Sequence, residues 1–327
     1  MAERLVECVP NISAGREREQ VERILSDLAA TNVSVLHVDI GEDANRTVFT
    51  YVGSPADVLE GSFALVESAA KHIDMQMHHG EHPRSGAVDV LPFVPLSGVD
   101  LAECVQLAKT LGQRVSSELG LPVYLYEAAA SAPHRRNLAD VRRGEYEGLA
   151  QKLREPEWLP DFGPIEFQPR FGALITGARE FLAAFNVNLV GADGSAARKI
   201  AAMVREKGAG SGPHLAGVKA IGWYMERYGC WQVSMNLTRL EACGLAEAYE
   251  ACRKCAGTLG VEVRGSELIG MIPKQVMLRA GQYYEGSQTL AEGDLISLAV
   301  TRLGLSALAN FEPSERILEL ALESKLK

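Results

Sequence analysis

Four of the seven histidines lie within eleven residues, and the cluster ends in one string, His78-His79-Gly80-Glu81-His82-Pro83-Arg84. The spacing from His78 to His82 fits H-x-x-E-H, a zinc-peptidase pattern, but that pattern works only on a helix. Pro83 disfavours the helical backbone for His82, and Gly80 weakens any helix through the string. The string therefore predicts a loop that presents His82. Zinc hydrolysis is the weaker alternative.

Within that loop, His82 and Arg84 have complementary chemistry. An imidazole has a reference pKa of ~6.5, so His82 can accept and donate protons near neutral pH. The guanidinium of Arg84 is suited to holding a carboxylate through two parallel hydrogen bonds. A lone histidine is more often a structural hydrogen-bonding group than a catalyst, but the loop position and the neighbouring arginine favour an acid–base role.

A second chemical feature is a stripe of uncharged polar side chains on two predicted strands. Exposed strand faces usually carry Lys, Glu and Thr, whereas this stripe carries amides and hydroxyls. A buried amide without a partner costs ~1–3 kcal/mol, so a covered stripe would need something polar to pair with it. The stripe is thus either a solvent-facing side of a sheet or part of a ligand site. Its members are Asn186, Asn188, Gln232, Ser234 and Asn236.

Asp39 is a third candidate, because it shares a predicted strand face with His37 and precedes Gly41 and the turn at residues 45–47. An acid at a strand end can orient a histidine or stabilise a cationic intermediate. A turn-capping role is the alternative. Among the six cysteines only Cys252 and Cys255 are closely spaced, with no second pair or nearby histidine, so we predict no metal or redox site and a reducing, cytoplasmic environment.

The elements that must position these residues repeat along the chain. Hydrophobic periodicity gives the order β-α-β-β-α-β twice, which predicts two split βαβ units, the ferredoxin-like arrangement of an α+β fold. We place the boundary between residues 1–177 and 178–327. The first unit is predicted from segments 4–10, 21–29, 33–40, 47–53, 55–69 and 87–94, and the second from 181–190, 196–206, 218–225, 231–237, 246–259 and 261–269.

Composition narrows the classes of partner. The 327 residues include 33 Lys and Arg against 42 Asp and Glu, a formal net charge of −9. Nucleic acid and anionic membrane surfaces select basic proteins, so neither is expected as a partner. The longest apolar runs are under ten residues and the N-terminus has no apolar signal stretch, so we expect no membrane span and no leader.

Several strings, in this order, resemble the glutamate formiminotransferase family, which includes the formiminotransferase half of formiminotransferase–cyclodeaminase. The resemblance runs through nearly the whole chain. It is carried by Glu7-Cys8-Val9-Pro10-Asn11, Asn45-Arg46-Thr47-Val48, Gly80-Glu81-His82-Pro83-Arg84, Asp161-Phe162-Gly163-Pro164, Ala184-Phe185-Asn186-Val187-Asn188-Leu189, Gln232-Val233-Ser234-Met235-Asn236-Leu237-Thr238 and Gly265-Ser266-Glu267-Leu268.

The resemblance implies a duplicated ferredoxin-like fold that acts as a homodimer. It also implies that His82 is catalytic, that Asp39 assists, and that Glu267 lies near the site. Tetrahydrofolate is implied as a co-substrate, and no metal or tightly held cofactor is implied. The implied folate-contacting segment is Gly163, Pro164, Ile165, Glu166, Phe167, Gln168, Pro169, Arg170, Phe171 and Gly172.

The implied reaction transfers the formimino group of N-formimino-L-glutamate to N5 of tetrahydrofolate, in histidine degradation. Ser85 and Trp231 depart from the family pattern and leave the donor open, so formiminoglycine or another formimino compound is an alternative. A non-catalytic folate sensor is a further alternative function. Residues 131–143 carry four arginines and one acid, which with Arg84 and Arg170 predicts a basic tunnel in an acidic body.

Overall fold

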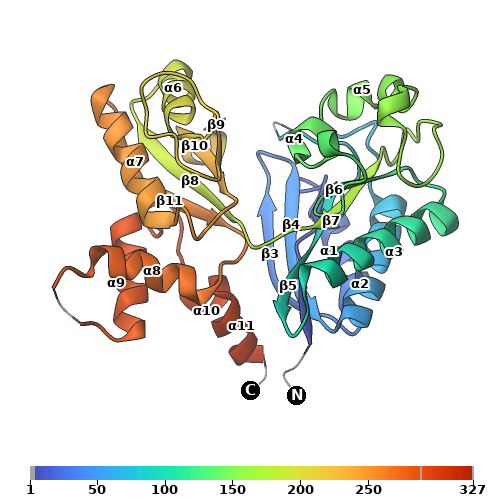
Figure 1. Ribbon diagram of the computed structural model, residues 1–327, viewed down its shortest axis with the longest axis horizontal. Helices are drawn as coiled ribbons and strands as arrows, with labels where there is room; N and C mark the ends of the chain where they lie inside the picture. Colours follow the sequence, from blue (N-terminus) through green and yellow to red (C-terminus); the bar gives the residue numbers. More distant parts are fainter. Residues whose placement is uncertain (1–3, 81, 288, 326–327) are drawn as a thin grey trace. The chain divides into compact units, whose positions relative to one another are not determined.

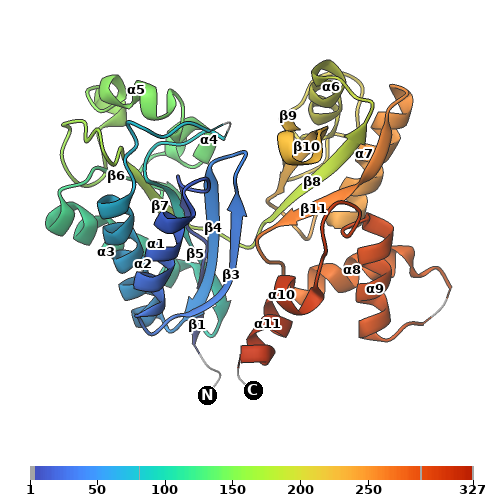
Figure 2. The same ribbon diagram turned by 180° about the vertical axis from the view of Figure 1, so that it is seen from behind.

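The computed structural model describes residues 4–80, 82–287 and 289–325. The chain divides into two compact units, Met1–Glu180 (unit 1) and Phe181–Lys327 (unit 2), each built around its own sheet (Figures 1 and 2). The boundary predicted after residue 177 falls within the strand β7 (Leu174–Ala178). The predicted order β-α-β-β-α-β is confirmed in both units, which are ferredoxin-like.

In the sheet of unit 1, the first strand of the βαββαβ unit lies between the third and the fourth strand of that unit. The strands β1 and β2 both lie between β4 and β5, and β3 pairs with β4. Two further strands extend the sheet in parallel beyond β5, first β7 and then β6. The bounds are β1 Leu5–Cys8, β2 Asn11–Ile12, β3 Ser34–Gly41, β4 Arg46–Gly53, β5 Val88–Ser97 and β6 Val123–Glu127.

The longer helices of unit 1 have clear local signals. The helix α2 (Pro55–His72) begins after Ser54, whose hydroxyl accepts a hydrogen bond from the N–H of Asp57. The helix α3 (Leu101–Leu119) begins with a capping box and ends at a left-handed glycine, Gly120. With α1 (Arg18–Ala29) these helices pack on the sheet and form its main core.

A second, smaller core of unit 1 lies beside β6. It gathers Tyr124 and Tyr126 of β6 around Trp158. The short helices α4 (Leu138–Val141) and α5 (Glu145–Lys152) contribute Val141 and Leu149 to it and are green in Figure 1. This small core matters for the site because it fixes the chain segment that carries Arg142.

Unit 2 has the strand order β11-β8-β10-β9, antiparallel throughout. The side chains of Phe185, Val187 and Met235 point into a core that α6 and α7 cover. The residues that alternate with them carry the polar stripe. The bounds are β8 Ala183–Val190, α6 Gly194–Val204, β9 Val218–Met225, β10 Cys230–Leu237, α7 Leu245–Thr258, β11 Glu262–Ile269, α8 Lys274–Glu285, α9 Glu292–Leu303, α10 Pro313–Arg316 and α11 Leu318–Lys325.

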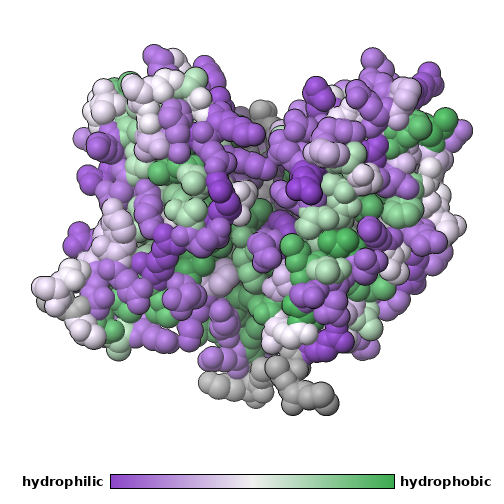
Figure 3. Space-filling model, viewed as in Figure 1, coloured by the Kyte–Doolittle hydropathy of each residue, from purple (hydrophilic) through white to green (hydrophobic). Residues whose placement is uncertain are grey.

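The face seen in Figure 3 is mostly hydrophilic, with smaller apolar patches between. Exposed large apolar side chains are spread over distant elements, for example Met77, Ile221 and Tyr283. None of the helices in the described part of the chain has both the length and the apolar character needed to cross a bilayer.

Candidate active site

His82 lies in the loop that joins α2 to β5, and its ring has one defined proton position. The ring nitrogen Nδ1 is 2.7 Å from the carbonyl oxygen of Pro83. A carbonyl oxygen can only accept, so Nδ1 carries the proton and Nε2 is the basic nitrogen of the neutral ring. Burial, and then the positive charges of Arg46 and Arg142, lower the pKa of His82 to about 3. The side chain is therefore a neutral imidazole at neutral pH.

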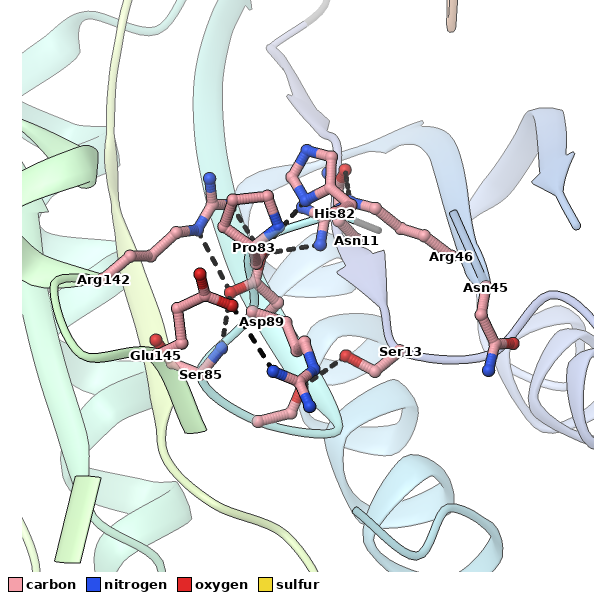
Figure 4. Close-up of polar contacts among 12 residues, drawn as sticks. Asn11, Ser13, Asn45, Arg46, His82, Pro83, Ser85, Asp89, Arg142 and Glu145 are labelled. Atoms are coloured by element: carbon pink, nitrogen blue, oxygen red, sulfur yellow. Dashed lines mark hydrogen bonds and ion pairs between the residues drawn. The ribbon is translucent and has the colours of Figure 1, made fainter. Parts of the chain in front are cut away.

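Next to His82 lies a buried cluster of three charged side chains, Arg46, Asp89 and Arg142, which we call the arginine–aspartate cluster. Asp89 is fully buried, and its Oδ2 lies 2.6 Å from Arg46 Nη1 and 2.5 Å from Arg142 Nη2. Figure 4 shows the two arginines approaching Asp89 from different elements. Arg46 opens β4, Asp89 lies in β5, and Arg142 follows α4.

Further hydrogen bonds fix the orientation of this cluster. The Nε–H of Arg142 and the backbone N–H of Ser85 both donate to Asp89 Oδ1, at 3.2 Å and 3.0 Å. The Nε–H of Arg46 donates to Asn11 Oδ1 at 3.0 Å. Asp89 thus ties the loop that carries His82 to both arginines, so the cluster positions the histidine as well as its electrostatic surroundings.

The arginine–aspartate cluster carries an excess of positive charge, which shifts the pKa values of its members. Burial by itself would raise the pKa of Asp89, but the charges of Arg142 and Arg46 outweigh it and lower the pKa to about 2. Burial lowers the pKa of Arg46 to about 10, because the attraction of Asp89 only partly offsets the burial and the repulsion of Arg142. Two guanidinium groups share one carboxylate, which leaves the cluster with a net charge of +1.

Arg84, predicted to bind a substrate carboxylate, already has carboxylate partners inside unit 1. Its guanidinium makes two hydrogen bonds to Glu147, at 2.8 Å and 2.5 Å, and a longer one of 3.4 Å to Glu145. The backbone oxygen of Arg84 accepts from the N–H of Tyr146 at 2.8 Å. These contacts join the loop to α5, a structural role that the sequence did not suggest.

His78 is also fully engaged within the loop. Its Nδ1 accepts from Nε–H of Arg84 at 3.3 Å, so its Nε2–H donates to the carbonyl of Asn45 at 2.8 Å. Described residues 73–80 and 82–87 form no helix, as the proline and glycine predicted. Because both ring nitrogens of His78 are used, the H-x-x-E-H zinc pattern loses one of its ligands. Glu81, the acid of that pattern, lies outside the described residues.

The predicted folate segment, residues 163–172, is a loop that ends beside the His82 loop. Gly172 has φ +78°, and a Cβ there would lie 2.2 Å from the carbonyl oxygen of Ser85. Phe171 is buried, and its carbonyl accepts from the N–H of Ala87 at 2.7 Å. At the other end Gly163 has φ +91°. Between these ends Ile165, Glu166, Pro169 and Arg170 are exposed, while Pro164, Phe167 and Gln168 are half-buried.

Asp39 lies near the other edge of the same sheet. It sits in β3 opposite Val48, and its Oδ2 is 3.9 Å from Nε2 of His37. Two residues later Gly41 pairs with Arg46, the first arginine of the cluster. The predicted sharing of a strand face by Asp39 and His37 is therefore confirmed, and the strand leads directly to the cluster.

In unit 2 the amide stripe forms a chain of hydrogen bonds. The indole N–H of Trp223 donates to Gln232 Oε1 at 2.9 Å, and the Gln232 Nε2 donates to Asn188 Oδ1 at 2.6 Å. Gln232 Nε2 is also 3.4 Å from Glu267, which accepts from the Tyr228 hydroxyl at 2.9 Å. Gln232 and Asn188 are fully buried, and Nδ2 of Asn188 has no partner among the described residues. A buried donor of this kind suits a polar ligand.

The remaining members of the stripe lie on the same sheet but outside this chain of hydrogen bonds. Asn186 is buried and aligns with Ser234 of β10 and with Glu267 of β11. Ser234 is half-buried and Asn236 is exposed. The structure thus brings Asn188, Gln232 and Glu267 together and leaves Asn236 at the solvent.

Comparison with known proteins gives the family. Residues 5–179 match the family model described as "Formiminotransferase domain, N-terminal subdomain", and residues 184–323 match "Formiminotransferase domain". The chain belongs to the formiminotransferase family.

Relatives of this formiminotransferase-family chain include proteins of its own length and longer ones. It is 43% identical to "Glutamate formimidoyltransferase" of Streptococcus pyogenes serotype M1, over 86% of the chain and 93% of the relative. It is 44% and 47% identical to "Formimidoyltransferase-cyclodeaminase" of Dictyostelium discoideum and Rattus norvegicus, over 99% and 96% of the chain. It spans only 61% and 59% of these two relatives.

Sequence reasoning missed the arginine–aspartate cluster of this formiminotransferase-family chain. Asp89 was the available signal, since an acid inside the apolar run 87–94 is buried and rarely stands without a cationic partner. The sequence did not identify that partner, because Arg46 and Arg142 lie 43 and 53 residues from Asp89 along the chain.

Proposed function

We propose that this protein is a glutamate formimidoyltransferase that transfers the formimino group of N-formimino-L-glutamate to N5 of tetrahydrofolate. The observation that carries the proposal is a neutral His82, with Nδ1 protonated and Nε2 basic, beside a cationic cluster. Relatives named glutamate formimidoyltransferase support the same activity. Tetrahydrofolate is a co-substrate in this scheme, and no bound metal takes part.

The reaction needs one proton to move between two nitrogens. N5 of tetrahydrofolate attacks the formimino carbon, and a C–N bond forms to give a tetrahedral centre. Nε2 of His82 takes the proton from N5 and delivers it to the nitrogen of the departing glutamate, whose bond to carbon then breaks. The products are 5-formiminotetrahydrofolate and glutamate. One histidine can serve as base and then as acid.

The other predicted residues take supporting roles in this proposal. Asp39 stabilises the cationic amidinium-like centre, and within unit 2 Glu267, Asn188 and Gln232 bind a polar group of a ligand. Residues 163–172 contact the folate, which is supported by the hydrogen bond from the N–H of Ala87, at the end of the His82 loop, to the carbonyl of Phe171. We assign Arg84 to positioning the loop, because its guanidinium is already paired with Glu147. A cytoplasmic homodimer belongs to the same proposal, and light scattering of the purified protein tests the dimer.

Steady-state kinetics of His82→Ala test the catalytic assignment. General acid–base help is typically worth 10²–10⁴-fold, so kcat should fall by about that factor while folate binding is kept. His79→Ala is the matched control, since His79 is an exposed histidine of the same loop. Near-full activity of His82→Ala would overturn the role of His82.

Comparison of donors separates the alternatives. Turnover of formiminoglutamate well above that of formiminoglycine supports the proposed donor, and the reverse order replaces it. Calorimetric binding of tetrahydrofolate with no turnover of either donor would instead favour a non-catalytic folate sensor.

A further inference from the structure

The arginine–aspartate cluster differs from the other buried ion pairs of unit 1 in its charge balance. Arg135 pairs one-to-one with Asp161, and both side chains are 8% exposed. Arg84 faces two carboxylates. In the cluster, by contrast, the side chains of Arg46 and Arg142 are 8% and 14% exposed and share one fully buried carboxylate. A buried charge without a counter-charge is costly, so the cluster is poised to accept an anion.

Each arginine has donors left over after its internal hydrogen bonds. Arg46 uses Nε and Nη1 for Asn11 and Asp89, and Arg142 uses Nε and Nη2 for Asp89. Within the described residues, Nη2 of Arg46 and Nη1 of Arg142 make no hydrogen bond or ion pair. Neither atom is a buried polar atom without a partner, so both are reached by solvent. These two donor groups therefore remain accessible next to His82.

We propose that Arg46 and Arg142 form a carboxylate subsite that binds the α-carboxylate of the formimino donor. The inference rests on the proposed function and specifies how that site holds its donor. In formiminoglutamate the α-carboxylate is attached to the carbon that bears the reacting nitrogen. The carboxylates of a folate are separated from N5 by the whole p-aminobenzoyl group. A subsite beside His82 therefore fits the donor.

Binding of an anion here has a consequence for His82. Among the described residues, the charges of Arg46, Arg142 and Asp89 act on the ring, and the two arginines lower its pKa. A bound carboxylate balances the excess positive charge and raises the pKa of His82 towards the range in which a general base is effective. The histidine thus becomes a better base only when the donor is present.

Direct binding measurements test the subsite without turnover. The probe is N-formyl-L-glutamate, which replaces the formimino nitrogen with oxygen, and titration calorimetry compares wild type, His82→Ala, Arg142→Gln and Arg143→Gln. Arg142→Gln leaves Arg46 and Asp89 as a balanced pair, which should preserve folding. Arg143 is the exposed neighbour and serves as the control. A charge-assisted hydrogen bond contributes ~1.5–3 kcal/mol, so Arg142→Gln should weaken binding by about 10- to 100-fold, while the other two variants bind as wild type.

Two further ligands identify the source of the carboxylate. N-formyl-L-isoglutamine lacks the α-carboxylate, and so both arginine contacts, and should bind wild type at least as weakly as N-formyl-L-glutamate binds Arg142→Gln. p-Aminobenzoyl-L-glutamate should bind wild type and Arg142→Gln alike. The proposal is overturned if Arg142→Gln binds N-formyl-L-glutamate as wild type does, or if only p-aminobenzoyl-L-glutamate is lost.

A second variant guards against misfolding, and the binding assay keeps the two proposals apart. Arg142→Lys retains the charge without the planar fork and should bind N-formyl-L-glutamate with intermediate affinity. If Arg142→Gln loses no more affinity for N-formyl-L-glutamate than Arg143→Gln does, the subsite is contradicted. Because His82→Ala removes the acid–base group but not the subsite, its activity and its binding of the analogue report on different proposals.

Discussion

Replacing Asp89 with asparagine removes the one counter-charge of the arginine–aspartate cluster. The asparagine oxygen can still accept from Ser85 or Arg142, but the new amide N–H groups face the guanidinium of Arg46, which lies 2.6 Å from Asp89 in the native protein. Breaking a buried ion pair by removing one partner costs ~3–5 kcal/mol, because a charge remains buried without compensation. At ~2–4 °C per kcal/mol for a unit of this size, the midpoint of unfolding of unit 1 should fall by about 6–20 °C.

Urea unfolding and calorimetry of Asp89→Asn measure this cost, with Asp140→Asn as the control. Asp140 is an exposed aspartate of the same unit, and its replacement should stay within about 0.5 kcal/mol of wild type. A triple variant with apolar residues at all three cluster positions should regain much of the lost stability, since no charge is then buried. A loss below 1 kcal/mol in Asp89→Asn would refute the reasoning, because it would mean that the two guanidinium groups are solvated or paired elsewhere.

Two further outcomes follow from other parts of the site. Unfolded His82 takes up a proton near pH 6.5, whereas in the native protein its pKa is about 3, so acidification in this window favours unfolding. Between pH 7 and pH 5 the free energy of unfolding, measured by urea titration, should therefore fall by about 2 kcal/mol less in His82→Gln than in wild type. An equal fall in both proteins would contradict the low pKa of His82. In unit 2, Gln232→Leu removes the amide that donates to the buried Asn188 Oδ1 and accepts from the Trp223 N–H, and it should cost about 1–3 kcal/mol of unfolding free energy, against almost no change for Ser234→Ala. An unchanged free energy of unfolding in Gln232→Leu would show that water replaces these hydrogen bonds in the variant.

The elements of the fold were predictable because local patterns decide them. Alternation with a period of two, and apolar spacing at 3.6 residues, gave both βαββαβ units in order. The loop at His82 was predictable as well, since Pro83 and Gly80 exclude a helix whatever the rest of the chain does. These features depend on the residues themselves and on their immediate neighbours.

The partners of charged side chains were not predictable, because they depend on contacts between distant segments. Arg84 was expected to hold a substrate carboxylate, and α5 supplies Glu147 for it, 63 residues along the chain. The basic run 131–143 was interpreted as free positive charge, but Arg135 is paired with Asp161 and Arg142 shares Asp89. A residue type states which kind of partner it needs, and only the fold decides whether the protein or a ligand provides it.

The net charge of −9 and a site for anionic substrates are compatible because the two act over different distances. Charges at the solvent-exposed surface are screened beyond about 8 Å at physiological salt, so most of the acidic residues contribute little at His82. Two opposite charges 4 Å apart near a protein surface attract by ~4 kcal/mol before the cost of removing them from water. A single uncompensated charge in the arginine–aspartate cluster therefore outweighs the remote excess of carboxylates. Affinity for an anionic donor should consequently depend only weakly on salt, in contrast to an anion held by exposed lysines and arginines.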